Sequence, residues 1–171
     1  MLAEKNTGSY GSGTGRFTML SLGEKRWNGR KVIVYSDGAT ATYQDSRGRL
    51  LAIVRGSRRV ATFEPYFATF DWPLYVGKQW LNRYRYTDHE RGQTYDNLQQ
   101  DARVEAYEKV KTPAGTFKAF KIVLANPLLE EVVWWSPGLG IFVKYKLERF
   151  RGHPLKAGTR ERVLVSYSLK R

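Results

Sequence analysis

The fold is decided by residues 104–147, which read VEAYEKVKTPAGTFKAFKIVLANPLLEEVVWWSPGLGIFVKYKL. Near the start, Thr112-Pro113-Ala114-Gly115 places proline and glycine where a β-turn favours them. Residues 116–124 follow with β-branched and aromatic side chains and predict a strand. Asn126-Pro127 interrupts this run, and residues 130–136 predict a second strand. The short turns favour antiparallel neighbours.

The third strand of this stretch alternates clearly between apolar and charged side chains. Ser136-Pro137-Gly138-Leu139 predicts a type II turn before it, with a positive φ at Gly138. Period-two alternation is typical of a strand with one buried face. We therefore expect one set of side chains to face inward and the other outward: Ile141, Val143, Tyr145 and Leu147 inward, and Lys144, Lys146 and Glu148 outward.

Short strands separated by turns continue on both sides of this stretch. Asn28-Gly29 is a strong hairpin signal, and the last strand is expected over residues 161–169. No segment has a convincing helical pattern. The sequence predicts an all-β fold, an antiparallel meander of about ten strands curled into a barrel or half-barrel. Residues 1–15, rich in glycine and serine, are expected to be a flexible segment, and residues 16–171 a single domain.

Composition narrows the classes of function. The 171 residues carry 29 basic and 16 acidic side chains, a net charge of +13, and no cysteine. The absence of cysteine excludes disulfides, zinc–thiolate sites and thiol catalysis. No apolar run is long enough for a transmembrane helix. The basic charge favours anionic partners such as lipid headgroups, acidic glycans or nucleic acid, although it also serves solubility.

Three segments together resemble a family of small exported bacterial proteins of unknown function, the TapB-like proteins. They are TPAGTFKAFKI (residues 112–122), WWSPGLGIFVKY (residues 134–145) and WPLYVGKQW (residues 72–80). The resemblance covers roughly residues 70–170. It implies an all-β protein of the bacterial periplasm or cell envelope and brings no catalytic residues. Since no signal peptide is visible, we expect the export signal to be absent from this sequence.

Aromatic side chains gather in the connection that spans residues 64–77. A ring-lined ligand mouth is one interpretation, and a loop that plugs the open end of a barrel is the other. The residues of the candidate mouth are Tyr66, Phe67, Phe70, Trp72 and Tyr75.

Four cations form a second candidate site. The strands over residues 141–147 and 161–169 are expected to pair, with Val143, Tyr145, Val163 and Val165 on the core face. Strand alternation would then place the cations together on the solvent face. This patch could meet an anionic surface, and its members are Lys144, Lys146, Arg160 and Arg162.

Other chemistries have weaker support. Asp88-His89-Glu90 could bind a metal or serve a hydrolase, but a short acidic loop is usually only solvated. Glu130 and Glu131 are adjacent on a strand and point to opposite faces, so they cannot act together as acid and base. The segment WLNRYRY (residues 80–86) could stack on bases, yet alternation separates its rings from its arginines.

We therefore favour a noncatalytic exported β module over an enzyme, binding an amphiphile or a component of the cell envelope. A nucleic-acid or other polyanion-binding protein is the alternative, and nucleic acid is the less favoured partner. No cofactor or metal is expected. The sequence leaves the ligand and the oligomeric state open.

Overall fold

The computed structural model describes residues 1–168, and these form thirteen strands in one antiparallel sheet. Residues 1–168 contain no helix, and therefore none of the length and apolarity needed to cross a membrane. The strands are β1 (Leu2–Gly8), β2 (Gly13–Phe17), β3 (Leu20–Trp27), β4 (Arg30–Ser36), β5 (Ala41–Gln44), β6 (Leu50–Arg55), β7 (Arg58–Phe67), β8 (Gln79–Asp88), β9 (Gln93–Thr112), β10 (Gly115–Asn126), β11 (Leu129–Ser136), β12 (Ile141–Arg149) and β13 (Gly158–Leu164).

The strand order is β2-β1-β13-β12-β11-β10-β9-β8-β7-β6-β5-β4-β3, a meander that the N-terminal hairpin extends beyond β13. Within residues 1–168 no pairing joins β2 to β3, so the sheet is not closed into a barrel. The all-β antiparallel prediction is confirmed in this coarser form. The chain forms two compact units, unit 1 (residues 1–17, 74–80 and 101–171) and unit 2 (residues 18–73 and 81–100).

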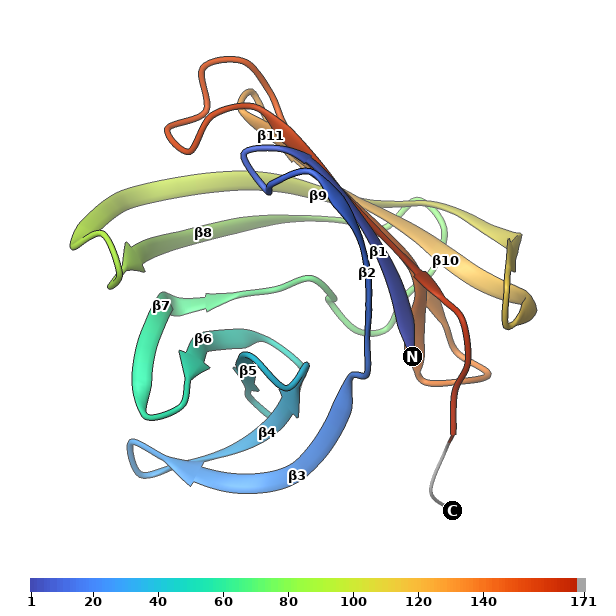
Figure 1. Ribbon diagram of the computed structural model, residues 1–171, viewed down its shortest axis with the longest axis horizontal. Helices are drawn as coiled ribbons and strands as arrows, with labels where there is room; N and C mark the ends of the chain where they lie inside the picture. Colours follow the sequence, from blue (N-terminus) through green and yellow to red (C-terminus); the bar gives the residue numbers. More distant parts are fainter. Residues whose placement is uncertain (169–171) are drawn as a thin grey trace. The chain divides into compact units, whose positions relative to one another are not determined.

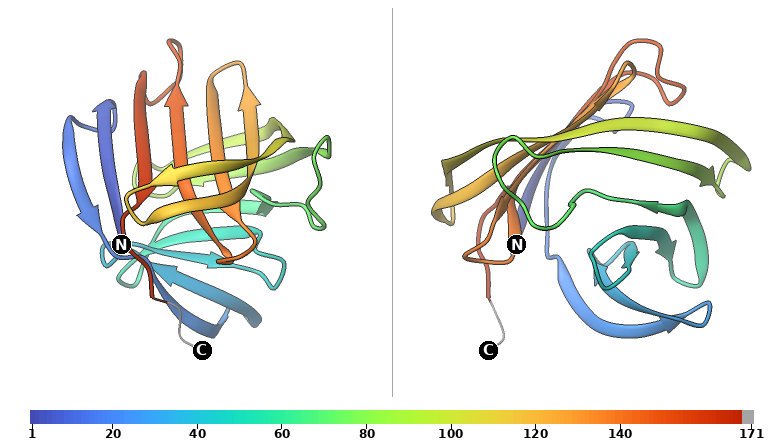
Figure 2. Two further views of the ribbon diagram at one scale, coloured as in Figure 1. Left: turned by 90° about the vertical axis from the view of Figure 1, so that its right-hand side faces the viewer. Right: turned by 180° about the vertical axis from the view of Figure 1, so that it is seen from behind.

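Unit 1 contains the stretch that the sequence identified as decisive. Figure 2 shows β2, β1, β13, β12, β11 and β10 side by side. The expected meander of β10, β11 and β12 is confirmed by its registers, which include Ile122 opposite Val133 and Val133 opposite Tyr145. The core of this unit is aliphatic, and its buried members include Leu2, Val104, Ile122, Leu124, Val133, Val143 and Leu164.

The N-terminal segment, expected to be flexible, forms β1 and the start of β2. β1 pairs with β13 from Leu2 opposite Leu164 to Gly8 opposite Gly158. Leu2 is only 3% exposed. The glycines and serines gather at the turn after β1, while residues 2–7 supply backbone donors and acceptors to an otherwise unpaired edge. A free strand edge can order a polar segment whose composition alone suggests flexibility.

The backbone angles of two turns can be compared with those that the sequence predicts. Asn28 and Gly29 have φ of 48° and 75°, as the predicted Asn-Gly hairpin requires. The prediction of a positive φ at Gly138 is wrong, because the left-handed residue is Gly140, with φ of 68°. Its amide donates to the Ser136 carbonyl at 2.8 Å. The turn is one residue longer than the predicted type II turn. The residue that needs a left-handed conformation is therefore Gly140, directly before β12.

Strands β3 to β7 of unit 2 form a curled sheet, as Figure 1 shows. Val32, Val34 and Leu51 form a buried cluster there, covered by Trp27, Ala41, Tyr43 and Tyr66. A second group of rings packs between β7 and β8. Phe63 lies 5.3 Å from Tyr86, and Phe67 lies 5.3 Å from Tyr84, measured between ring centroids. Unit 2 therefore combines an aliphatic cluster with a group of packed aromatic rings.

Candidate functional site

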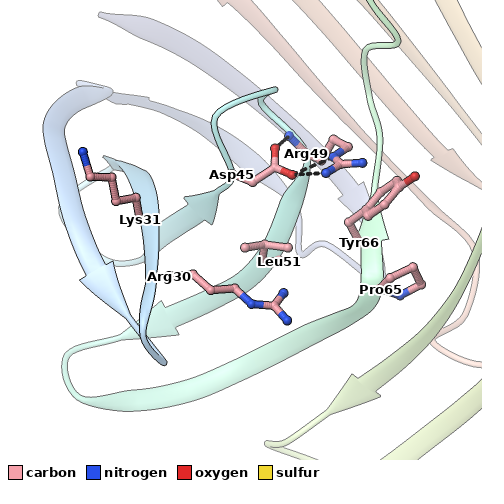
Figure 3. Close-up of a pocket in the computed structure, with 7 residues that line it drawn as sticks. All are labelled: Arg30, Lys31, Asp45, Arg49, Leu51, Pro65 and Tyr66. Atoms are coloured by element: carbon pink, nitrogen blue, oxygen red, sulfur yellow. Dashed lines mark hydrogen bonds and ion pairs between the residues drawn. The ribbon is translucent and has the colours of Figure 1, made fainter.

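A pocket of about 350 Å³ opens on the curled sheet of unit 2. Its lining comes from β4, from the turn that precedes β6, and from β6 and β7, and consists of Arg30, Lys31, Asp45, Arg49, Leu51, Pro65 and Tyr66. Figure 3 shows these residues. Three of the seven are basic and one is acidic, while Leu51, Pro65 and Tyr66 supply apolar surface. The pocket therefore combines positive charge with an apolar wall.

Arg49 is held in place by the turn that precedes β6. The Asp45 carboxylate first closes this turn, with its Oδ1 accepting hydrogen bonds from the amides of Arg47 at 2.9 Å and Arg49 at 3.0 Å. Its Oδ2 then accepts from Nε and Nη2 of Arg49, both at 2.6 Å. Asp45 thus closes the turn and also orients the guanidinium.

Tyr66 fixes the other side of the same guanidinium. The Arg49 Cζ lies 3.9 Å from the centroid of the Tyr66 ring, a close cation–π contact. Partial burial of Arg49 disfavours its charge, but the hydrogen bond and charge of Asp45 outweigh this effect and raise the pKa of Arg49 above its usual value. Arg49 is therefore a permanent, positioned cation with donors left over after Asp45 is satisfied.

Arg30 and Lys31 are adjacent in sequence, but strand alternation separates them. Figure 3 shows the two side chains pointing in different directions. Lys31 Nζ lies 3.5 Å from Glu24 on β3. No carboxylate within residues 1–168 lies within ion-pair distance of Arg30. Arg30 follows the Asn28-Gly29 turn and shares a strand face with the buried Val32. It is therefore the unpaired charge of the pocket.

The predicted aromatic mouth does not form one site. Tyr66 lines the pocket, whereas its neighbour Phe67 is 6% exposed and packs against Phe63 and Tyr84. Phe70 stacks on Trp72 with centroids 5.6 Å apart, and the Trp72 Nε1 donates to the Arg47 carbonyl.

Tyr75, the fifth member of the predicted mouth, belongs to unit 1, whereas the other four belong to unit 2. It is 58% exposed. Within unit 2, Phe67 packs with the rings of Phe63 and Tyr84 and does not line the pocket with Tyr66. Tyr66 alone among the predicted rings contributes to the pocket.

The predicted cationic patch is divided between two faces. β12 and β13 do pair, but their register places Arg162 opposite Tyr145 and Arg160 opposite Leu147. Lys144 lies instead opposite Val163, and Lys146 opposite Glu161. Residues opposite each other in an antiparallel pair project to the same side. The two arginines thus share the face of Tyr145 and Leu147, and the two lysines lie on the other.

The arginines can occupy that face because unit 1 supplies partners for them. Glu4 Oε2 accepts from Arg162 Nε at 2.5 Å and lies 3.5 Å from Arg160 Nε. Tyr10 offers its ring to Arg160 at 4.5 Å. These contacts come from the N-terminal hairpin, which the sequence reading had placed outside the domain. Val165 lies after the end of β13, and Leu169 lies outside the described residues.

The residues considered for hydrolysis are engaged in local structure. The Asp88 Oδ1 accepts from the amides of Glu90 and Arg91, both at 3.0 Å, and its Oδ2 accepts from Arg91 Nη1 at 2.8 Å. Burial raises the pKa of Asp88, but these hydrogen bonds more than offset it, so the pKa lies below its usual value. His89 Nε2 lies 3.1 Å from the Thr62 hydroxyl. Within residues 1–168 no group of three His, Cys, Asp or Glu side chains could hold a metal ion.

The segment over residues 80–86 follows the expected alternation. Tyr84 is buried and Tyr86 half-buried, whereas Arg83 and Arg85 are exposed. The Arg85 guanidinium pairs with Asp96 and lies 3.9 Å from Glu64. Its hydrogen bond and ion pair with Asp96 raise the pKa of Arg85. The rings and the cations therefore do not form a joint surface on which a base could stack.

Arg30, Asp45 and Arg49 were absent from the candidate sites that the sequence suggested. The only local signals were the turn composition of Asp45-Ser46-Arg47-Gly48 and the position of Arg30 after Asn28-Gly29. Neither signal identifies a site, because the pocket exists only where β4, β6 and β7 approach on one curled surface.

Comparisons with known proteins add little to this geometry. No family model matches the sequence, and no curated protein matches it. The fold search finds the crystal structure of a putative lipoprotein from Parabacteroides distasonis, with 12% identity and a TM-score of 0.30. The alignment covers 96% of this chain and 94% of that chain. Similarity at this level carries no functional argument, and the TapB-like resemblance remains a prediction.

Proposed function

We propose that this protein is a noncatalytic binding module that takes an anionic amphiphile into the pocket of unit 2. The observation that carries the proposal is that the unpaired Arg30 and the positioned Arg49 line one pocket together with an apolar wall. A surface that existed only for solubility would not need an arginine fixed by both Asp45 and Tyr66.

The two arginines suit an anionic headgroup. A guanidinium presents several N–H donors in a plane and binds carboxylate or phosphate oxygens through paired hydrogen bonds. Arg49 is already oriented, so little side-chain entropy is lost when it binds. Arg30 would gain its first charged partner. A carboxylate or phosphate monoester is therefore the headgroup class that we expect.

The apolar wall suits a short hydrocarbon segment next to that headgroup. Leu51 is 6% exposed and continues into the cluster of Val32 and Val34. Tyr66 and Pro65 form the adjoining surface. At about 350 Å³ the pocket lies near the lower end of the range, about 300–1,000 Å³, that is typical of small-molecule sites. It would hold the headgroup and the first part of a chain rather than a whole lipid.

An exported protein of the periplasm or cell envelope is part of this proposal and is supported by the resemblance of residues 70–170 to the TapB-like family. Anionic amphiphiles are abundant in that compartment. A polyanion-binding function is less well supported, because Arg85, Arg160 and Arg162 are paired with carboxylates within their own units.

Titration calorimetry with octyl phosphate, octanoate and the neutral octyl glucoside tests the proposal. We expect both anions to bind and the glucoside to bind at least about tenfold more weakly, since a charged hydrogen bond contributes about 1.5–3 kcal/mol. Arg30→Gln should weaken anion binding by about tenfold. Arg58→Gln is the matched control, because it removes the same charge from an exposed residue of unit 2 that does not line the pocket.

Arg49→Lys sharpens the result by keeping the charge and removing the planar group that stacks on Tyr66. We expect an intermediate loss of affinity in this variant. Equal binding of octyl phosphate by Arg30→Gln, Arg58→Gln and the parent would place the ligand elsewhere and overturn the proposal.

A further inference from the structure

Three connections of unit 1 meet at one end of its sheet. They are the β1–β2 turn (residues 9–12), the β10–β11 turn (residues 127–128) and the β12–β13 loop (residues 150–157), here together called the loop end. The Ser9 amide donates to the Ala157 carbonyl at 2.9 Å, and the Phe150 amide donates to the Leu128 carbonyl at 2.8 Å. Figure 2 shows these connections at the same end of the strands. The loop end is therefore one continuous surface.

Two large apolar side chains stand out from this surface. Leu128 is 39% exposed and Phe150 is 37% exposed. They come from different connections, and the backbone hydrogen bond between the two residues keeps them adjacent. Leu128 also lies over Gly152, where an added Cβ would be 3.8 Å from the Leu128 Cδ2. These are neighbouring side chains on a shared support rather than isolated exposed residues.

Cations flank this apolar pair. Arg151 and Lys156 are both exposed, and no carboxylate within residues 1–168 forms an ion pair with either. The three connections contain no aspartate or glutamate. Arg149, at the end of β12, lies over the Tyr10 ring at 4.2 Å and adds positive charge next to the loop. The loop end is thus uniformly basic around its apolar centre.

The β12–β13 loop is ordered by its own hydrogen bonds. The His153 amide donates to the Phe150 carbonyl at 3.2 Å, and the Lys156 amide donates to the His153 carbonyl at 2.8 Å. The Leu155 amide donates to the His153 Nδ1 at 3.0 Å. Burial and the charge of Arg149 lower the pKa of His153, so its ring is neutral at pH 7 and can accept this bond. A preformed loop loses little entropy when it binds.

We propose that the loop end of unit 1 docks on the surface of an anionic lipid bilayer, with Leu128 and Phe150 entering the interface and Arg151 and Lys156 contacting lipid phosphates. Aromatic and aliphatic side chains next to basic residues are the composition that binds at such interfaces. This site is separate from the pocket of unit 2, and the proposal does not rest on the function assigned to that pocket.

Two other partners fit the loop end less well. A second copy of the chain that docked through the same surface would bring Arg151 and Lys156 against their own counterparts, which would repel each other. Nucleic acid would satisfy the cations but would leave Leu128 without an apolar environment. A bilayer interface satisfies both kinds of side chain because negative headgroups lie directly above hydrocarbon.

Site-specific labelling tests the insertion directly, because the chain has no cysteine. Leu128→Cys and Phe150→Cys would be labelled with an environment-sensitive fluorophore. Vesicles of phosphatidylglycerol and phosphatidylcholine in a one-to-two ratio should shift the emission of both labels to shorter wavelength. Leu20→Cys in unit 2 is the control, since Leu20 is 54% exposed. Equal shifts at all three positions, or no shift at Leu128 and Phe150, would overturn the proposal.

Vesicle flotation then separates the apolar and the charged contributions. The double variant Leu128→Ser/Phe150→Ser should bind the anionic vesicles roughly tenfold more weakly. Arg151→Gln/Lys156→Gln should lose binding to a similar degree, roughly tenfold, with little effect on pure phosphatidylcholine vesicles. Arg58→Gln/Arg83→Gln is the matched control, because it removes two exposed cations from unit 2.

Circular dichroism should show that all these variants remain folded. Binding of octyl phosphate should be unchanged in the loop-end variants, so that failure of either proposal can be recognised separately. Vesicle binding that fell equally in the loop-end and control variants would reflect total charge alone and would overturn the proposal. Competition between single-stranded DNA and vesicles would also overturn the proposal if Arg151→Gln/Lys156→Gln lost binding to both and Leu128→Ser/Phe150→Ser lost binding to neither.

Discussion

Arginine, tyrosine and a carboxylate occur together in both units, with different outcomes. In unit 1, Glu4 accepts from Arg162 and also lies near Arg160, while Tyr10 and Phe17 cover the guanidiniums. In unit 2, Arg49 donates to the Asp45 carboxylate and its guanidinium lies over the Tyr66 ring.

The difference lies in whether each arginine of the group lies within ion-pair distance of a carboxylate. Arg160 and Arg162 both lie near Glu4, whereas Arg30 has no carboxylate partner within residues 1–168. Two arginines that share a carboxylate stabilise the fold, whereas an arginine without a carboxylate partner can bind an anion. Under the proposed function, the arginine cluster of unit 1 is structural and the pocket of unit 2 binds the ligand.

The largest effect should come from Gly158, which supports the N-terminal hairpin of unit 1. A Cβ at Gly158 would lie 2.6 Å from the Ser9 nitrogen and 2.6 Å from the Thr7 carbonyl oxygen, both main-chain atoms. We expect Gly158→Ala to lower the free energy of unfolding by about 3 kcal/mol. Chemical denaturation would measure the change.

Gly56→Ala in unit 2 is the control, because Gly56 has a φ of 59° but an added Cβ would meet nothing within 4 Å. It should cost only about 1 kcal/mol, from backbone strain. A loss at Gly158 no larger than at Gly56 would show that β1 does not pack closely on β13.

The next effect concerns the charge cluster of unit 1. Glu4→Gln removes the carboxylate that Arg160 and Arg162 share and should cost about 2–3 kcal/mol, since the side chains are mostly but not fully buried. Glu24→Gln in unit 2 breaks the exposed pair with Lys31 and should cost less than about 0.5 kcal/mol. Similar costs in urea denaturation would contradict the distinction between a structural cluster and surface charge.

A pH effect distinguishes two glutamates within unit 1. Burial raises the pKa of Glu131 to about 7, only partly offset by a hydrogen bond from Tyr145. Because the folded protein holds this proton more tightly than the unfolded chain, the contribution of Glu131 to stability is present below about pH 4.5 and is lost as the pH rises to about 7. Glu4 behaves oppositely, since hydrogen bonds from Arg162 and Asn6 outweigh burial and lower its pKa.

Glu131→Gln should therefore become more stable relative to the parent as the pH rises from about 4.5 to about 7, by on the order of 1–3 kcal/mol. Thermal unfolding at several pH values would measure the difference. A difference that stayed constant over this interval would show that Glu131 is as well solvated in the folded protein as in the unfolded chain.

Local patterns in the sequence determined much of the strand architecture. Alternation and turn residues predicted β10, β11 and β12, the Asn28-Gly29 hairpin and the pairing of β12 with β13. They succeeded because a strand exposes its two faces in strict alternation and because Asn-Gly adopts left-handed conformations at little cost. Ile122 and Leu124, two positions apart on β10, are both 0% exposed.

Only the tertiary structure decided which faces meet and which charges remain unpaired. The register of β13 against β12 placed Arg160 and Arg162 opposite Leu147 and Tyr145, because Glu4 and Tyr10 of the N-terminal hairpin are there to receive them. A shift of one residue moves every side chain of a strand to the other face, and no pattern within a single strand fixes that shift. The same reason hid the pocket, because Arg30 of β4, Arg49 of the turn before β6 and Tyr66 of β7 line one pocket only when the sheet curls.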